Sequence, residues 1–277
     1  MILWHAFQDL DPKIKGYLPG SWRLLKTWGV NEVPARAPPL PEPVLHAMCG
    51  WAFFHNHITF GISLLIGFYG MLRTGEILSL TRRNLSSHSS QEKVLISLGL
   101  TKSGKRAGAA ESVILGYDKA VKPVKKWMTL ATTSHSLSRN PGNWRKLFND
   151  ALSGLRLTQY NFRPYSLRRG GATWWFSRHH SLDQILIQGR WQAVKTARIY
   201  LNEGLALLAE LKIPTTDPIL HHFFDYFQQK SVQDLLPHLS LLPRSKDQGD
   251  VVKDASGPIT SLKRVFFRWN CPEGGED

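Results

Sequence analysis

The sequence contains little cysteine, few acidic residues and no apolar run long enough to cross a membrane. Its two cysteines, Cys49 and Cys271, cannot form a disulfide framework and are more typical of a reducing intracellular compartment. The first residues lack the basic segment followed by an apolar one that marks a secretory signal. The longest apolar run, Ile58 to Leu72, is shorter than the roughly 20 residues of a membrane-spanning helix. We therefore expect an intracellular protein in which that run forms a buried helix.

The shortage of acidic residues is confined to the middle of the chain. The whole sequence of 277 residues carries 35 Lys and Arg against 21 Asp and Glu, a formal net charge of +14. Residues 51–200 hold 22 basic and 6 acidic residues, whereas residues 201–277 hold 8 and 11 and residues 1–50 hold 5 and 4. This concentration favours a polyanionic partner, most often nucleic acid, over a basic surface that only keeps the protein in solution. Because 42% of the residues are hydrophobic, a disordered chain is excluded.

Local patterns predict a mostly helical α+β protein with one small antiparallel β-hairpin. The segment VPARAPPLPEP (33–43) carries five of the sixteen prolines and predicts a linker or domain boundary. Residues 93–100 and 111–116 are short and rich in β-branched and aliphatic residues, and the basic segment between them predicts a charged hairpin tip. We expect two helices over 44–80, the second beginning at 58, and a mostly helical stretch over 119–160. Further helices are expected over 166–179, 193–211 and 216–242, with a short one between Ser181 and Gly189. Near the N-terminus, Trp22, Leu25 and Trp28 have helical spacing.

Two motifs contain arginines that could bind a phosphate. In MLRTGEIL, Arg73 emerges from the apolar helix and Glu76 follows three residues later on the same face, which by itself favours a structural ion pair. In PYSLRRGGAT, Arg168 and Arg169 fall in the first turn of a predicted helix. Backbone N–H groups and a guanidinium fork at a helix start suit a phosphate, and a solvated basic helix start is an equal alternative.

Two further motifs supply an aromatic hydroxyl and a lysine. In GRWQAVKTARIYL, Trp191 follows the break at Gly189, and Tyr200 lies on the next helix. A tyrosine at such a position is more often a core residue, and Lys102, at the hairpin tip, would by itself be read as solvated. Two arginines from separate helices, a lysine, an indole donor and a tyrosine could nevertheless converge on one phosphodiester. That set suffices for metal-free phosphoryl transfer through a covalent intermediate.

In order and spacing, these motifs resemble the catalytic domain of the tyrosine recombinases, the phage-integrase family, over residues 44–212. The first box of the family, Arg then Gly-Glu and an aliphatic run, matches Arg73, Gly75, Glu76, Ile77 and Leu80. The second box, His-x-Leu-Arg then Ala-Thr, matches Tyr165, Leu167, Arg168, Ala172 and Thr173, with Tyr165 in place of the usual His. The third box matches Gly189, Trp191, Thr196 and Tyr200, and the hairpin lysine of the family follows a Thr as Lys102 follows Thr101.

The resemblance implies site-specific DNA recombination or integration by strand cleavage and rejoining. It makes Tyr200 the nucleophile that forms a 3′-phosphotyrosyl link. Arg73, Arg168 and Trp191 would bind the non-bridging oxygens, and Lys102 would protonate the departing 5′ oxygen. Tyr165 would act as a hydrogen-bond donor, because a phenol with an ordinary pKa near 10 is a poor base.

The same resemblance implies supporting residues and partners. Glu76 would orient Arg73, and Thr196 would support the site. The residues expected to contact DNA are Arg169, Lys105, Arg106, Arg190 and Lys195. The expected partners are double-stranded DNA and further copies of the chain, as a tetramer on DNA. No cofactor or metal is expected, since the eleven His and two Cys show no ligand-like cluster. A eukaryotic host would place the protein in the nucleus, any other host in the cytoplasm.

Two other functions stay open at this stage. Family members carry a separate N-terminal helical domain, so we interpret residues 1–43 as its remnant plus the Pro-rich linker, and residues 44–212 as the catalytic domain. The chain could then be a catalytically weak or inactive DNA-binding remnant of a mobile element. It could also be a type IB topoisomerase, which uses similar chemistry. Residues 213–277 are expected to form a helical extension and a loose tail, in which FFDYF (223–227) is either an ordinary packing helix or a contact with a neighbouring protomer.

Overall fold

The computed structural model describes most of the chain between residues 36 and 229. The described residues are 36–87, 92–99, 110–138, 140–201, 203–213 and 217–229, together with Gly20, Ser21, Arg23, Leu24, Thr27, Thr101 and Gly104. Lys102, Lys105, Arg106, Trp22, Leu25 and Trp28, on which several predictions depend, lie outside the described residues.

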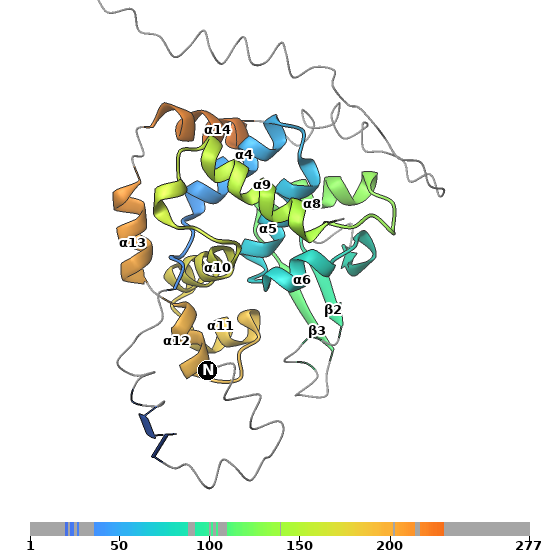
Figure 1. Cartoon of the computed structure of the whole chain (residues 1–277). Helices are drawn as coiled ribbons and strands as arrows, with labels where there is room; N and C mark the ends of the chain where they lie inside the picture. The colour runs from blue at the N-terminus through green and yellow to red at the C-terminus, as the bar shows by residue number, and fades with distance from the viewer. Residues whose placement is uncertain are drawn as a thin grey trace, which may run out of the picture. The chain divides into compact units, whose positions relative to one another are not determined.

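The described part is mostly helical with one three-stranded antiparallel sheet, so the predicted α+β class is confirmed (Figure 1). The elements are α4 (Glu42–Phe54), α5 (Ile58–Tyr69), α6 (Thr74–Ser79), η1 (Arg82–Asn84), β1 (Leu85–Ser86), β2 (Val94–Gly99), β3 (Glu111–Leu115), α8 (Asp118–Leu130), α9 (Pro141–Gly154), η2 (Thr158–Tyr160), α10 (Pro164–His179), α11 (Leu182–Gly189), α12 (Val194–Tyr200), α13 (Glu203–Lys212) and α14 (Pro218–Gln229).

Helix α5 forms the centre of the main core. Nearly all of its residues are buried, because α4, α8 and α10 pack around it. At the crossing with α10, a Cβ on Gly171 would lie only 1.9 Å from the backbone oxygen of Phe68, so the two helices meet backbone to backbone. This close crossing fixes where α10, with its arginines, lies relative to the end of α5.

The predicted hairpin is confirmed. Strands β2 and β3 pair antiparallel, with Val94 opposite Leu115 and Ile96 opposite Val113, and these four side chains face the core. The short strand β1 adds to the other edge of β2 and was not predicted, since two residues carry no alternation pattern. Figure 1 shows β2 and β3 running side by side.

The predicted helix from residue 58 to residue 80 is wrong, because the chain turns between Tyr69 and Thr74. Met71 adopts a left-handed conformation with φ of 46°, and Arg73 is extended and begins α6. The Glu76 carboxylate accepts the backbone N–H of Arg73 at 2.8 Å and so caps the start of the new helix. The predicted helix over 193–211 is likewise split, because Leu201 is extended between α12 and α13.

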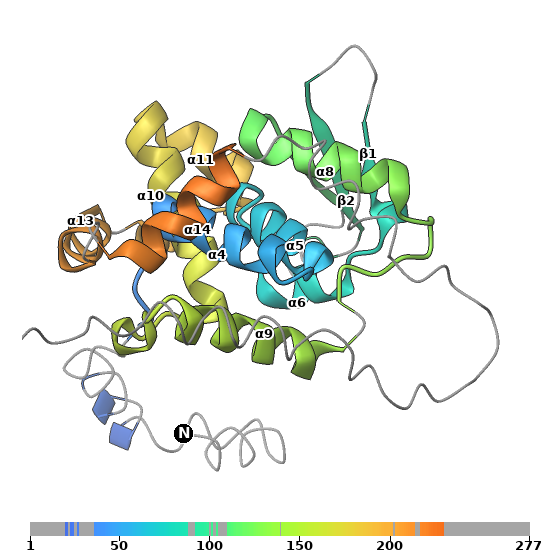
Figure 2. The same cartoon turned by 90° about the horizontal axis from the view of Figure 1, so that it is seen from above.

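The segment before α4 and the last described helix, α14, both pack onto the helical core. Leu40, within the predicted linker, is buried, and its N–H bonds to the Ser166 carbonyl of α10 at 3.1 Å, so the end of that segment is not an open linker. At the other end α14 lies across α4 (Figure 2), with Leu220 and Phe223 buried. FFDYF is thus part of a helix that packs on the core, and its contact with a neighbouring protomer stays a prediction, whereas residues 230–242 of the predicted helix lie outside the described chain.

Candidate active site

A small second core joins the end of α5 to helices α10, α11 and α12. Met71, Ala172, Ile185, Trp191 and Ala197 are buried in it, and Tyr200 packs at its edge. Figure 1 shows α11 and α12 beside α10, on the side away from α4 and α14. The structure therefore brings together the three helical segments that carry the predicted site residues.

Arg168 lies at the centre of this cluster. Its guanidinium carbon is 5.1 Å from the ring centroids of both Trp191 and Tyr200, in the range of cation–π contacts. Its Nη1 donates to the Met71 carbonyl at 2.6 Å and its Nη2 to the Gly189 carbonyl at 2.7 Å. The side chain is only 1% exposed. Burial, together with nearby Arg190 and Arg73, lowers the pKa of Arg168 to about 10, so it stays protonated at neutral pH.

The sequence pattern predicted that the two adjacent arginines of α10 lie in its first turn, and this prediction is wrong. The helix begins at Pro164, which places Tyr165 in the first turn and Arg168 and Arg169 in the second. Arg169 is buried, and its Nη1 donates to the Ala37 carbonyl at 2.5 Å. It thereby ties α10 to the segment before α4, and its predicted contact with DNA stays a prediction.

Glu76 is the common anion of the cluster. Its Oε1 accepts from Nη1 of Arg73 at 2.6 Å, and its Oε2 accepts from Nη2 of Arg190 at 2.7 Å and lies 3.9 Å from Nη1 of Arg168. Burial alone would raise the pKa of the Glu76 carboxyl, but Arg190 and the hydrogen bonds from Arg73 outweigh it and hold that pKa below its ordinary value. The predicted pairing of Arg73 with Glu76 is thus present. The pairing of Glu76 with Arg190 was not predicted, because no local pattern brings residues so distant in sequence together.

The two tyrosines of the site contact one another. The Tyr165 and Tyr200 ring centroids are 5.6 Å apart, and the two rings are tilted relative to one another. Burial first, and then the hydrogen bond to Tyr200, raise the pKa of Tyr165 well above its usual range. At neutral pH Tyr165 is therefore a neutral phenol, which can donate a hydrogen bond and cannot act as a base.

Trp191 completes the cluster. Its ring lies 4.7 Å from the Tyr200 ring, and its Nε1 is buried with no hydrogen-bond partner among the described residues. The Nε1 atoms of Trp127 and Trp174 are buried in the same way, and a donor of this kind can bond to a ligand or a water. Thr196 and Lys195 are exposed on α12, one turn or more before Tyr200, and their predicted roles stay predictions.

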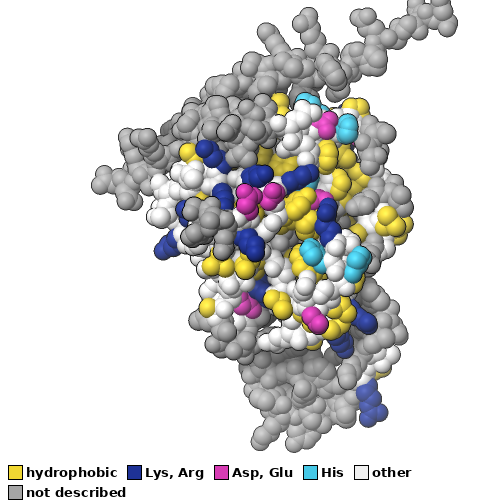
Figure 3. Space-filling view, turned by 180° about the vertical axis from the view of Figure 1, so that it is seen from behind, with side chains coloured by type: hydrophobic (Ala, Val, Ile, Leu, Met, Phe, Trp, Pro, Cys, Tyr) yellow, Lys and Arg dark blue, Asp and Glu magenta, His cyan; other side chains and the backbone are white. Residues whose placement is uncertain are grey.

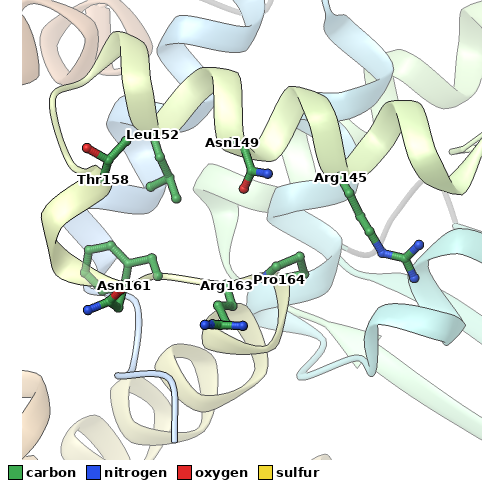
Figure 4. A pocket seen from close by; sticks show the side chains of 8 residues that line it. Arg145, Asn149, Leu152, Thr158, Asn161, Arg163 and Pro164 are labelled. Carbon is green, nitrogen blue, oxygen red and sulfur yellow. The ribbon is translucent and has the colours of Figure 1, made fainter.

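A groove lies between α9 and the start of α10 and was not predicted. Its volume is about 380 Å³, and the exposed guanidinium groups of Arg145 and Arg163 belong to its lining (Figure 4). The groove ends at Pro164, directly before Tyr165. It therefore presents positive charge beside the first turn of α10.

The described residues contain little that would support a metal site or a membrane-spanning helix. Within these ranges no group of three or more His, Cys, Asp or Glu is arranged to hold a metal ion. None of the helices described is both long enough and apolar enough to cross a membrane. On the face shown in Figure 3, lysines and arginines are interspersed with acidic and neutral side chains and do not gather into one continuous patch.

Comparison with known proteins finds similarity to solved structures alone. No family model matches, and a search of curated proteins finds no significant match. Among solved structures, the pre-cleavage complex of the XerH site-specific recombinase with its difH substrate is 15% identical, with a TM-score of 0.47, and covers 66% of this chain. The post-cleavage complex with a palindromic difH substrate is 16% identical, with a TM-score of 0.48 over 64% of this chain. The chain spans just over half of these recombinase chains, 56% and 54%.

Proposed function

We propose that the chain cleaves and rejoins DNA strands through a covalent link to Tyr200, as a site-specific recombinase or integrase. The observation that supports this best is the stacking of Trp191 and Tyr200 over the buried guanidinium of Arg168. A nucleophilic hydroxyl, a buried cation and an orphaned indole N–H in one cluster fit the needs of a phosphodiester.

In the proposed reaction the Tyr200 hydroxyl gives up its proton to solvent, its oxygen attacks phosphorus, and the bond from phosphorus to the 5′ oxygen breaks. The products are a 3′-phosphotyrosyl link and a 5′-hydroxyl, which takes its proton from Lys102. Arg73, Arg168 and Trp191 stabilise the charge that builds on the non-bridging oxygens. Rejoining is the reverse attack by a 5′-hydroxyl.

Contact between the phosphate and Arg168 requires a movement of the Tyr200 ring. Arg168 is buried beneath that ring and bonds to two backbone carbonyls. We infer that DNA draws Tyr200 away from this position and takes its place beside the guanidinium. The exposed Arg145 and Arg163 of the groove would contact neighbouring backbone phosphates, since guanidinium groups are typical phosphate ligands.

The test is covalent capture on a pool of nicked duplexes of random sequence. The nick lets the released strand diffuse away, so a Tyr200-linked product accumulates and survives boiling in detergent. Wild-type protein should give this product, and Tyr200→Phe should bind the same DNA without forming it. Retention on DNA with no covalent product in either protein would favour the DNA-binding remnant, whereas relaxation of any supercoiled plasmid would favour a topoisomerase.

A further inference from the structure

Arg190 occupies a backbone position that favours glycine. It directly follows the last residue of α11 and adopts the left-handed conformation, with φ of 56° and ψ of 48°. Glycine is the usual residue at such a helix end, because a residue with a Cβ is strained there. The Arg190 side chain is nevertheless only 6% exposed and lies against two carboxylates. The end of α11 therefore carries a strained residue whose guanidinium is buried among charged groups of the site.

The Glu76 carboxylate lies between Arg190 and the two arginines that we propose as phosphate ligands, Arg73 and Arg168. Its Oε2 accepts from Arg190 Nη2 at 2.7 Å and lies 3.9 Å from Arg168 Nη1. Its Oε1 accepts from Arg73 Nη1 at 2.6 Å, and the backbone N–H of Arg73 also bonds to Oε2. That backbone bond is local to the start of α6, whereas Arg190 ties the carboxylate to the end of α11. A carboxylate turns easily about its last side-chain bond, so this second tie restricts the plane in which Glu76 meets Arg73.

Arg190 is in turn held by the sheet. Its Nε lies 3.4 Å from Oε2 of Glu111, the first residue of β3. Both carboxylates are largely buried, so loss of the guanidinium between them would leave negative charge uncompensated. Contacts with β3 and α6 together thus determine where the Arg190 guanidinium lies.

We propose that Arg190 is a positioning residue for the strand cleavage proposed above, and that it acts by fixing the Glu76 carboxylate. Glu76 in turn directs the guanidinium of Arg73, whose side chain is 34% exposed and has no such restriction from its own packing. A misplacement of about 1 Å in a group that binds the reacting phosphate costs on the order of 100-fold in rate. This inference rests on the proposed function, and it gives Arg190 no contact of its own with the phosphate.

The first test is a double-mutant cycle on the rate of covalent capture with saturating nicked duplex. Arg190→Gly removes the guanidinium and suits the left-handed backbone, and we expect it to slow capture by on the order of 10- to 100-fold. Glu76→Gln should also slow capture. The double variant should be no slower than the slower single variant, because both changes act on the same path. Losses that multiply would mean that Arg190 acts on DNA directly, and capture by Arg190→Gly at the wild-type rate would mean that it has no role.

The pH profile is a second readout, which loss of a purely structural contact would not change. The charged groups that face Glu76 are Arg73, Arg168 and Arg190. Burial raises the pKa of the Glu76 carboxyl, and Arg190 is the first of the groups that oppose this rise. Without Arg190 that pKa should rise, so capture by Arg190→Gly should decline more steeply than wild type between about pH 8 and pH 5. The double variant should lose this extra decline, and equal profiles for Arg190→Gly and wild type would contradict the proposal.

Two further variants complete the experiment. Arg156→Gly is the matched control, because Arg156 is exposed, lies just after α9 and has the same left-handed φ of 56°. It should change neither the rate nor the profile. If circular dichroism shows that Arg190→Gly does not fold, Arg190→Lys replaces it in the cycle. Lysine keeps the charge without the planar fork that meets both carboxylates, so its several-fold loss should vanish in the Glu76→Gln background, and a loss that persists there overturns the proposal.

Failure of the proposed function gives a different result from failure of this inference. If wild-type protein forms no covalent product, strand cleavage is wrong and the role of Arg190 in it is wrong too. If wild-type protein forms the product and the losses from Arg190 and Glu76 multiply, only the role of Arg190 is wrong.

Discussion

The guanidinium carbon of Arg168 lies 5.1 Å from the centroid of the Tyr200 ring, directly within the second core. The Arg168 side chain therefore has two roles. Its Nη atoms donate to the carbonyls of Met71 and Gly189, and these hydrogen bonds join the end of α5 to the end of α11. Its charge also faces the only side chain that we propose as a nucleophile. Structural and catalytic contributions should therefore be separable by substitution.

Arg168→Met should lose both stability and covalent capture. The substitution leaves two buried carbonyls without donors, and each such loss costs about 1–3 kcal/mol, so we expect the free energy of unfolding to fall by roughly 2–5 kcal/mol. Urea unfolding followed by fluorescence measures this. Arg73→Ala is the control, since Arg73 is 34% exposed, and its loss should cost no more than about 1 kcal/mol while still abolishing capture. Equal stability of the two variants would contradict the structural role of Arg168.

Local patterns were enough to predict the parts of the fold that depend on neighbours in sequence. The short runs of β-branched and aliphatic residues at 93–100 and 111–116 predicted the hairpin, and Ser181 predicted the start of α11, where its Oγ accepts the Gln184 N–H at 3.3 Å. The pairing of Arg73 with Glu76 is also local. Each of these features depends on residues that are close together in the sequence, so it can be predicted from local patterns.

The features that were missed depend on distant residues. An uninterrupted apolar run gives no sign that the chain turns at Met71, because the turn is held by Arg168, which donates to the Met71 carbonyl. Arg190 was expected to contact DNA, whereas the structure buries it beside Glu76 and Glu111. Spacing along the chain shows which residue types are available, and packing decides which of them meet.

Gly171→Ala should destabilise the protein strongly. Its added methyl would meet the Phe68 backbone oxygen at 1.9 Å, and backbone cannot move aside as a flexible side chain can. We expect α10 to shift on α5 at a cost of at least about 1–3 kcal/mol. Gly75→Ala, in α6, has nothing within 4 Å of its added methyl and should stabilise by about 0.5–1 kcal/mol. Thermal unfolding of both variants checks this, and a Gly171 variant as stable as wild type would contradict the backbone contact.

His46 should make the protein less stable as the pH falls. Its ring bonds to Tyr69 and Gln228 in the core, and burial is the main reason that its pKa is lowered to about 4. The unfolded chain, in which this pKa is about 6.5, binds more protons between the two values, so stability is lost as pH drops through this range.

The measurement compares wild type with His46→Gln. The free-energy advantage of wild type should shrink by about 3 kcal/mol between about pH 7.5 and pH 4, and exposed carboxylates cancel in the difference. A difference that does not change with pH would show that His46 titrates alike in the folded and unfolded chains.

Tyr165→His should increase the rate of covalent capture. In the present site the Tyr165 phenol stays protonated at neutral pH, because burial and its bond to Tyr200 raise its pKa, and so it cannot remove the nucleophile's proton. Tyr165 is 37% exposed and its ring centroid is 5.6 Å from that of Tyr200, so an imidazole there would reach the hydroxyl. A well-placed general base contributes on the order of 10²-fold or more to such a rate.

The pH profile identifies the cause of any such gain. With histidine as the base, the capture rate should rise as the pH passes through about 6.5 and level off above it, whereas wild type should show no step there. Tyr165→Phe is the matched control: it removes only the phenolic hydroxyl and should be no faster than wild type. A histidine variant that is no faster, or whose rate has no step near neutral pH, would mean that loss of the nucleophile's proton does not limit cleavage. The slow part of the reaction would then be the movement of Tyr200 away from Arg168.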